Sequence, residues 1–396
     1  MGSSIFLLLL LYLALVVFID TVTPQSLRLD VFAAVAPMTA AALCTYRQTI
    51  FLGTLDFVIM ATTHALLPAS NSPVNRVAAV LGNALMVGAS IAVAKLRADR
   101  EDLLERIRDT GEAAQRALLR KLPLRTRHLL VDGFYVSAQR DALVGGDIYD
   151  AVDTPHGARV LIGDVRGKGL GTLGAGAAVL TAFREAAFHR SSLESGVQAM
   201  EQGLWRYNAS AAESGGESEA GEAAAGPEES GSEERFVTAL VFGTNSGTDT
   251  GTGSDGAGDW SAPGDTADDG TAGGVPMVFI GCGHVAPFLI GADGTVCELE
   301  PADPGLPLGL GELSGQPRTA QHVVLPPDAR LFTCTDGVTE ARDADGVFYP
   351  LADRLTDWAA LPTPELLQRL QADLDAYTGG QLADDVAVLV IGQADA

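Results

Sequence analysis

Residues 161–165, Leu-Ile-Gly-Asp-Val, place an acidic side chain at the end of an apolar run. Three further short segments share this arrangement, with an acid at the edge of a strand-like stretch: Val144-Gly145-Gly146-Asp147, Thr335-Asp336-Gly337 and Asp384-Asp385. A single Asp in such a place usually belongs to a turn. Acids at several strand ends predict a cage of carboxylates, and hard oxygen ligands of this kind suit Mg²⁺ or Mn²⁺.

Apolar residues beside these acids predict buried strands. Leu331 to Cys334 precedes Asp336, and Val386 to Ile391 follows Asp385. Short apolar runs of this length, bounded by turn residues, are typical of strands in a protein core. We therefore expect each acid at the mouth of a strand, where several side chains can converge.

The first hundred residues contain four predominantly apolar stretches: Ile5 to Ile19, Val31 to Thr45, Ile50 to Leu67 and Val77 to Ala94. A membrane-spanning helix needs about 20 apolar residues. No basic segment precedes the first stretch, and no cleavage site of small residues leads into a soluble domain, so a signal peptide is disfavoured. We expect about four transmembrane helices within residues 1–98; three or fewer is the alternative.

Lysine and arginine near the helix ends indicate orientation, because the cytoplasmic side of a membrane holds the excess. The last apolar stretch is followed by Lys95, Arg97, Arg100, Arg106 and Arg108, whereas the first and third connections contain only Arg28 and Arg76. This distribution predicts a multi-pass protein of the cell membrane with its large C-terminal part in the cytoplasm. Asp56 and His64 lie within the third stretch and either have a function there or face the bundle interior.

A linker follows the membrane region. Residues 99–122 have a helical pattern, with Leu103, Leu104, Ile107 and Leu118 among charged residues. Such a helix could pair with its copy in a homodimer, although it has too few heptads to decide this. Pro123 ends the pattern. We place the linker at residues 99–126 and expect the C-terminal domain to span residues 127–396.

Two segments interrupt this domain, near residues 209–234 and 244–274. Both are rich in Gly, Ser, Ala and acidic residues and have almost no branched apolar side chains. Segments of this composition do not bury enough surface to offset their ordering entropy, so we expect disordered insertions. Between them, Phe236 to Phe242 reads as a strand. The acidic balance of the chain, with a net charge of -24, argues against a nucleic-acid partner.

Seven motifs together resemble one protein family. They occur in family order over about residues 127–393 and are listed here as they stand in the chain: Val144-Gly-Gly-Asp147-Ile-Tyr-Asp150, Ile162-Gly-Asp164-Val-Arg-Gly-Lys168-Gly, Arg235-Phe-Val-Thr238-Ala, Gly281-Cys-Gly-His284, Leu306-Pro-Leu-Gly309, Thr335-Asp-Gly-Val-Thr-Glu340-Ala-Arg342 and Asp384-Asp385-Val386. The set resembles the metal-dependent serine/threonine protein phosphatases (PPM family), in the bacterial branch of SpoIIE and RsbU-like regulators.

The resemblance implies a fold and a site. The fold is α+β, a four-layer α-β-β-α sandwich of two antiparallel sheets that here follows an N-terminal transmembrane helix bundle. The catalytic site holds two ions, Mn²⁺ or Mg²⁺, on Asp147, Asp164, Asp336 and Asp384, with Asp164 bridging the ions and the Val165 carbonyl beside it. Asp385 is the alternative to Asp384. Two such ions activate a water for in-line attack, which agrees with the lack of a reactive Cys or Ser motif.

The resemblance also implies a substrate, namely phosphoserine or phosphothreonine on a regulatory protein of the anti-sigma factor antagonist type. The chain departs from the family at Arg166, where a small Ser is usual, and around His284. A different class of function is a non-catalytic membrane scaffold that binds a signalling partner. Retention of all four acids disfavours this alternative, because buried like charges are costly without a cation.

Overall fold

A computed structural model describes residues 2–22, 30–66, 73–137, 145–167, 170–218, 235–244 and 273–394. Contacts divide the chain into two compact units, Met1–Ile107 and Arg108–Ala396. Most of the two predicted insertions lies outside the described residues, as do Val144, Lys168 and Gly169 of the sequence motifs.

The N-terminal unit is helical, as its apolar stretches predict. Its helices are α1 (Gly2–Val22), α2 (Asp30–Ala33), α3 (Val35–Leu43), α4 (Tyr46–Leu66) and the first part of α5 (Pro73–Leu118). The stretch Val31 to Thr45 forms two helices rather than one. Pro37 explains the break, because it has no N–H to donate to the carbonyl of Ala33 and its ring crowds that carbonyl.

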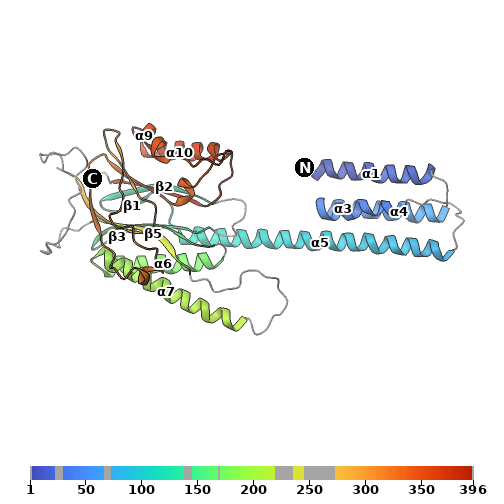
Figure 1. The fold of residues 1–396 in the computed structure, drawn as a ribbon, viewed down its shortest axis with the longest axis horizontal. Helices are drawn as coiled ribbons and strands as arrows, with labels where there is room; N and C mark the ends of the chain where they lie inside the picture. Colours follow the sequence, from blue (N-terminus) through green and yellow to red (C-terminus); the bar gives the residue numbers. More distant parts are fainter. Residues whose placement is uncertain are drawn as a thin grey trace. The chain divides into compact units, whose positions relative to one another are not determined.

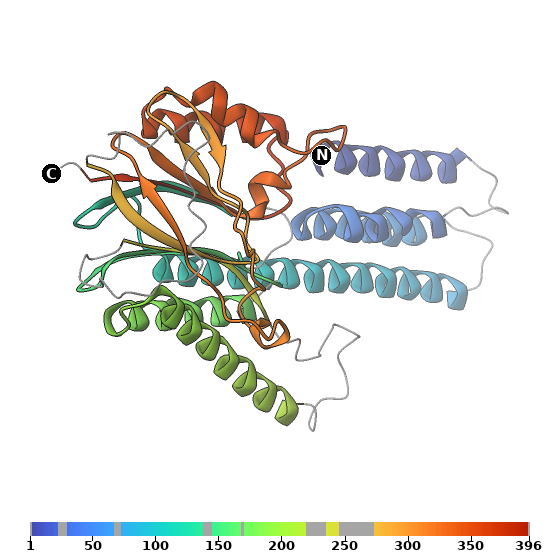
Figure 2. The same cartoon turned by 60° about the vertical axis from the view of Figure 1, so that its left-hand side comes forward.

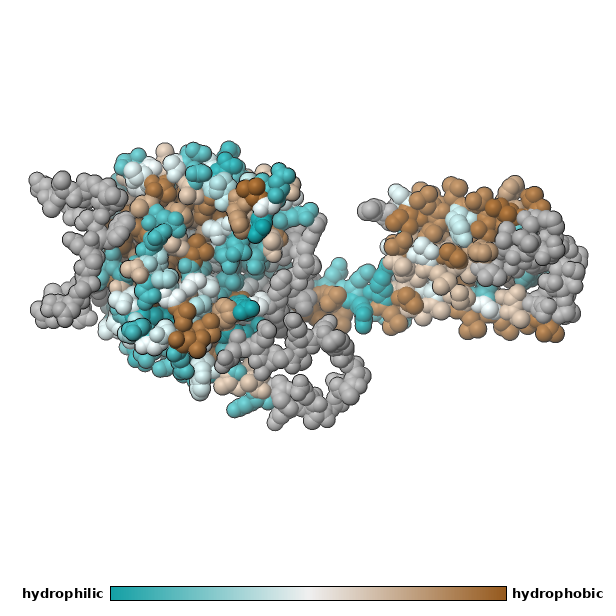
Figure 3. Space-filling model, viewed as in Figure 1, coloured by the Kyte–Doolittle hydropathy of each residue, from teal (hydrophilic) through white to brown (hydrophobic). Residues whose placement is uncertain are grey.

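Apolar side chains are exposed on the long helices of this unit and also fill much of its interior, where some polar side chains are buried as well. Exposed apolar residues occur on every long helix, among them Leu11, Phe51 and Leu85, and Figure 3 shows the hydrophobic colouring that covers these helices. Asp56 and Asn83 are buried, and Asn83 Nδ2 donates to Asp56 Oδ2 at 2.8 Å. Exposed apolar side chains together with a buried ionisable group are typical of membrane helix bundles.

Length and composition single out one helical segment among the described residues. Val77–Leu118, within α5, is long and apolar enough to cross a membrane, and Ser4–Asp20 is a shorter apolar helix. This result alone is weak evidence for a membrane protein, because a buried core helix or a signal sequence can satisfy the same criterion.

The C-terminal unit contains two antiparallel sheets (Figure 1). The first has the order β1-β2-β11-β10-β7-β8, with β1 (Leu124–Arg125), β2 (Leu129–Val136), β11 (Val386–Gln393), β10 (Arg330–Cys334), β7 (Phe288–Ile290) and β8 (Val296–Glu298). The second has the order β3-β4-β5-β6-β9, with β3 (Asp147–Thr154), β4 (Gly157–Val165), β5 (Val237–Thr244), β6 (Val275–Cys282) and β9 (Gln321–Leu325).

Helices cover both outer faces of the sheets, as Figure 2 shows. The helices α6 (Leu170–His189) and α7 (Leu193–Ser218) pack on the second sheet, whereas α9 (Leu351–Trp358) and α10 (Thr363–Tyr377) pack on the first. A third apolar cluster fills the space between the sheets. The predicted four-layer α-β-β-α sandwich is therefore confirmed.

Strand β4 shows why the apolar runs form central strands. Leu161 and Val165 belong to the cluster under α6 and α7, while Val160 and Ile162 belong to the cluster between the sheets. Successive side chains of a strand point to opposite faces, so a strand buried on both faces needs a continuous apolar sequence. The run therefore ends where Asp164 reaches the edge of the core.

Helix α7 extends further than the composition predicts. It continues to Ser218, so residues 209–218 of the first predicted insertion are helical. This segment contains Ala211, Ala212 and Glu213, which are among the best helix formers, and these residues are exposed. The high helix propensity of these residues thus explains why α7 continues beyond the part that packs on the sheet. Short one-turn helices, η1 (Gly311–Leu313) and α8 (Asp336–Thr339), complete the unit.

Candidate metal centre

Asp147 and Asp164 form the centre of the acidic site. They are direct partners across β3 and β4, so their backbones are fixed side by side by the strand register. The side chain of Asp147 is only 1% exposed, and that of Asp164 is partly buried. Two carboxylates opposite each other repel, which is tolerated where a cation or a proton neutralises them.

Asp336 reaches the site from the first sheet. It begins α8, directly after β10 and Thr335. Thr335 fixes this junction, because its Oγ1 donates to Asp147 Oδ2 at 2.8 Å and its backbone N–H donates to the carbonyl of Ala387 at 3.0 Å. One hydroxyl therefore connects the end of β10 to the acid on β3.

The two acids before β11 differ in their surroundings. Asp385 is 3% exposed, and its Oδ2 accepts the backbone N–H of Gly146 at 2.8 Å. Asp384 is exposed, and its Oδ1 accepts the N–H of Asp385 at 2.8 Å. Asp385 thus holds the turn before β3, while the charge of Asp384 is directed to the open side of the site.

Two glycines allow the backbone to approach these acids closely. A Cβ added at Gly146 would lie 2.5 Å from Asp164 Oδ1 and 2.7 Å from the Val165 carbonyl oxygen. A Cβ at Gly145 would lie 2.1 Å from Asp385 Oδ2. Any other residue would collide with an oxygen of the site. The carbonyl of Val165 and one oxygen of Asp164 therefore face the same small space.

Electrostatics supports a shared site. Burial and the negative charges of Asp336, Asp384 and Asp385 raise the pKa of Asp164 to about 7. Burial and the charge of Asp164 raise the pKa of Asp147 well above its ordinary value. Burial and the charge of Asp384 raise the pKa of Asp336 as well. All the predicted site acids thus interact, and a divalent cation would remove this repulsion.

The carboxylates do not form a closed cage by themselves. Among the residues that the structure describes, no three acidic, His or Cys side chains converge tightly enough to hold a bare ion. This arrangement fits Mg²⁺ and similar ions, which keep several waters and use few protein carboxylates. The donor set is therefore suited to hydrated hard cations rather than to zinc.

Other residues singled out by the sequence lie beside the acids. His284 Nδ1 is 3.1 Å from Thr238 Oγ1, and burial lowers the pKa of His284 to about 4, so it is neutral near pH 7. The guanidinium of Arg166 stacks over the ring of Phe236, with 4.9 Å to the centroid. Arg166 is exposed, so a long side chain can stand there in place of a small one without a steric clash.

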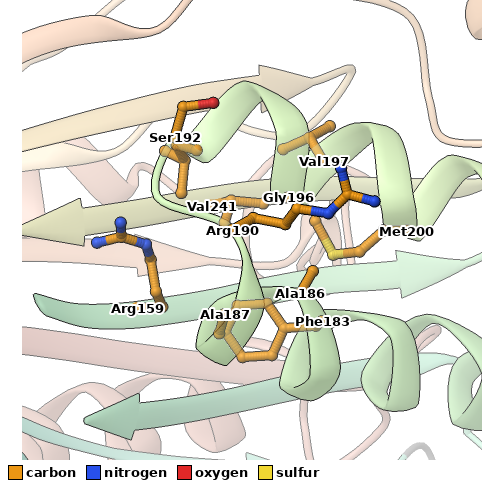
Figure 4. Close-up of a pocket in the computed structure, with 11 residues that line it drawn as sticks. Arg159, Phe183, Ala186, Ala187, Arg190, Ser192, Gly196, Val197, Met200 and Val241 are labelled. Carbon is orange, nitrogen blue, oxygen red and sulfur yellow. The ribbon is translucent and has the colours of Figure 1, made fainter. Parts of the chain in front are cut away.

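A hollow between β4, α6 and α7 does not compete as the site (Figure 4). It is lined mainly by apolar residues such as Phe183 and Met200. The buried guanidinium of Arg159 beside it donates to the carbonyls of Thr244 and Ser191, each at 2.9 Å. Arg159 therefore has a structural role there.

Sequence reasoning missed two residues of the site. Thr335 stands inside a recognised motif but had no assigned role. Gln115, in α5, is buried and contacts the turn that precedes β3. The helical spacing could have indicated that Gln115 is buried. It lies four residues after the buried Gly111 and three before Leu118, so these residues share the packed face of the helix.

Comparison with known proteins supports the fold. Residues 275–393 match the sequence model of the family Stage II sporulation protein E (SpoIIE), whereas no curated protein sequence matches the chain. The PP2C domain of SiaA from Pseudomonas aeruginosa superposes with a TM-score of 0.50 at 19% identity, covering 75% of this chain and 99% of that domain.

Two further structures are more distant. The RsbU and RsbW domains of a Mycobacterium tuberculosis protein give a TM-score of 0.45 at 19% identity, covering 67% of this chain and 60% of that one. The PP2C domain of SpoIIE from Bacillus subtilis, with a fragment of its regulatory domain, gives 0.45 at 13% identity, covering 68% and 65%. The C-terminal unit therefore has the fold of the PP2C-type phosphatases, and its residues 275–393 match the SpoIIE family, which supports a protein phosphatase.

Proposed function

We propose that this chain is a membrane-anchored serine/threonine phosphatase that uses two divalent cations, Mn²⁺ or Mg²⁺, to dephosphorylate a regulatory protein. The observation that carries the proposal is the convergence of acids from β3, β4, α8 and the residues before β11, whose charges contribute to the raised pKa values of Asp147, Asp164 and Asp336. Such a cluster is unfavourable by itself and becomes favourable when cations bind.

The ligand assignment follows from the position of each oxygen. Asp164 would contact both cations, and this role is supported by the interaction of its charge with those of Asp336 and Asp384. The carbonyl of Val165 lies beside the same space. Asp147 is held by Thr335 and completes the set. Asp384 is preferred to Asp385, because Asp384 is exposed at the site whereas Asp385 is buried against the turn before β3.

Two cations bound there would lower the pKa of a shared water and clamp the phosphoryl oxygens for in-line attack. The protein's own contribution is positioning. Thr335 and the Gly145–Gly146 turn fix Asp147 against Asp164, and the strand register fixes their backbones. No protein nucleophile is required, which is consistent with the raised pKa values of the buried thiols Cys282 and Cys334, whose largest cause is burial.

We further propose a phosphoserine or phosphothreonine protein of the anti-sigma factor antagonist type as the substrate. The support is the family match and the RsbU and RsbW domains present together in one of the similar structures. The membrane anchor is supported by the exposed apolar side chains of the helical unit and by its buried pair of Asp56 and Asn83. The cytoplasmic location of the phosphatase is supported by the Lys and Arg that follow residue 94.

The test uses the full-length chain in detergent, with and without Mn²⁺. We expect hydrolysis of a generic phosphate monoester only with the cation, and faster hydrolysis of phosphorylated antagonist proteins than of phosphotyrosine peptides or small phosphometabolites. Partner binding without any cation-dependent hydrolysis would favour the scaffold instead. A metabolite turned over far faster than every phosphoprotein would refute the proposed substrate class and leave the metal chemistry intact.

A further inference from the structure

Gln115 contacts the acidic site from the end of α5. It is 5% exposed. Its Oε1 accepts the backbone N–H of Gly145 at 3.1 Å, and its Nε2 donates to the Tyr135 hydroxyl at 3.0 Å and to the Asp147 carbonyl at 3.4 Å. One carboxamide thus binds both sides of the turn that delivers Asp147, using its donor and its acceptor.

The partners of Gln115 belong to the same small region as the acids. The next N–H in the turn, that of Gly146, is held by Asp385. Burial and the charges of Asp385 and Asp147 raise the pKa of Tyr135, so its hydroxyl stays protonated. Consecutive N–H groups of the turn are therefore held by two different elements, α5 and the start of β11. Loss of either partner leaves a buried donor unsatisfied.

The end of α5 is fastened to β3 at a second place. The carbonyl of Leu118 accepts from Arg184 Nη2 at 2.9 Å. Arg184 and Arg120 both pair with the fully buried Asp150, at 2.5 Å and 3.4 Å. The segment around residues 115–120 is thus attached beside Asp147 and again beside Asp150. Along β3 these two points are about 10 Å apart. The contacts therefore fix where this segment lies along the strand.

A helix that moves along its axis by one residue moves by about 1.5 Å. Such a shift would break hydrogen bonds of ordinary length, because these weaken steeply with distance and angle. The contacts of Gln115 are the ones directly linked to the turn before Asp147. Helix α5 is also the helix that contains the apolar segment long enough to cross a membrane.

We propose that Gln115 is a positioning residue for the acidic site. It holds the Gly145–Asp147 turn in the conformation that binds the cations, and displacement of the end of α5 lowers cation affinity by releasing this turn. The inference rests on the proposed function for the identity of the ligand, but it concerns affinity rather than turnover. The regulated quantity is the fraction of protein with bound cations.

The experiment compares the full-length chain with Gln115→Met, which keeps the length of the side chain and removes the amide. Gln115→Asn is a second variant that keeps an amide but is one methylene too short. Calorimetry measures Mn²⁺ affinity, and phosphate ester hydrolysis is followed against Mn²⁺ concentration. We expect about a tenfold weaker Mn²⁺ affinity in both variants, as for the loss of one or two buried hydrogen bonds, and a matching rise in the Mn²⁺ concentration that gives half-maximal hydrolysis.

Two controls isolate the effect. Arg116→Ala changes the next, exposed residue of the same helix, and Gln198→Ala removes an exposed helical Gln from α7. Both should bind Mn²⁺ like the wild type. Unchanged affinity in the Gln115 variants would refute the proposal, as would a lower melting temperature and rate with an unchanged Mn²⁺ dependence. If the wild type bound Mn²⁺ without hydrolysing any ester, the proposed function would fail, while the calorimetric comparison would still decide the role of Gln115.

Discussion

Asp147 and Asp164 face each other in register across β3 and β4, with the pKa of Asp164 raised to about 7. Like charges in directly opposite positions destabilise a sheet. The register leaves no room for the backbones to separate, because β4 is also paired with β5 along its length. The fold therefore places at this point a repulsion that binding of a cation or a proton relieves.

The first prediction concerns stability without metal. Asp164 has an ordinary pKa of 3.8 and a folded pKa of about 7, so folding favours its protonated form. The stability that the Asp164 carboxyl contributes is fully present below about pH 4 and is lost as the pH rises through about 7. In chelator, Asp164→Asn should be more stable than the wild type at pH 8.5, on the order of 1 to 3 kcal/mol, and the difference should be smaller at pH 5.

Thermal unfolding at the two pH values measures this difference. With Mn²⁺ present the order should reverse at pH 8.5, because the wild type gains the free energy of cation binding. A variant less stable than the wild type in chelator at pH 8.5 would contradict the repulsion that we infer.

The second prediction concerns catalysis. Asp164→Asn and Asp336→Asn should each lower the rate of ester hydrolysis by more than about a hundredfold, because each disrupts the two-cation clamp. Glu298→Gln, at the exposed edge strand β8, is the matched control and should leave the rate unchanged. Full wild-type activity in excess chelator would rule out the cation mechanism.

The third prediction separates the two acids before β11. Asp385→Asn keeps an oxygen for the Gly146 N–H and should weaken Mn²⁺ affinity less than Asp384→Asn, which removes a charge from the open side of the site. We expect about a tenfold weaker affinity for Asp384→Asn. Asp385→Ala should instead lower the stability by about 1 to 3 kcal/mol, because it leaves a buried N–H unsatisfied. The opposite ranking in calorimetry would make Asp385 the ligand.

The fourth prediction concerns the connection between β5 and β6. These strands are antiparallel partners in which Thr244 faces Met277, so a short connection can join them. Replacing residues 246–272 with a short glycine-containing turn should change stability little, since each halving of a loop alters its closure free energy by about 0.6 kcal/mol. Basal ester hydrolysis should stay within about twofold. A large fall in melting temperature would show that the replaced residues pack against the domain.

Much of the fold could be predicted because the central strands consist almost entirely of apolar residues. The runs before Asp164 and Asp336 and after Asp385 form β4, β10 and β11, where the burial of both faces demands apolar residues throughout. The order of the strands in the sheets does not follow from such local patterns. The resemblance to a family predicted only the sandwich of two antiparallel sheets, and not this order.

The parts that could not be predicted depend on contacts between distant segments. Asp384 was preferred to Asp385 through the family resemblance, whereas the hydrogen bond that holds Asp385 to Gly146 joins residues 239 positions apart, which no local pattern contains. The role of Gln115 depends on where α5 ends against β3, which no local pattern contains. The end of α7 was misjudged for a different reason, because low hydrophobicity excludes packing but does not exclude an exposed helix rich in Ala and Glu.

The last prediction concerns the membrane. A reporter fused after Arg100 should lie in the cytoplasm, and one inserted between Asp20 and Arg28 should lie outside the cell, because the basic residues gather after residue 94. The helical unit supports insertion, since many large apolar side chains are exposed on its helices and its Asp56 is paired with Asn83 inside. Replacing the exposed Leu85 and Leu81 with Lys should reduce insertion, by about 2.5 to 3.5 kcal/mol for each central charge. Changing the exposed Asp102 to Asn should leave insertion unchanged.

Alkali extraction of membranes and reporter activity measure both effects. If the two reporters were in the same compartment, the chain would have a different number of spans; release of the wild-type chain by alkali would show that its apolar helices pack against protein rather than lipid.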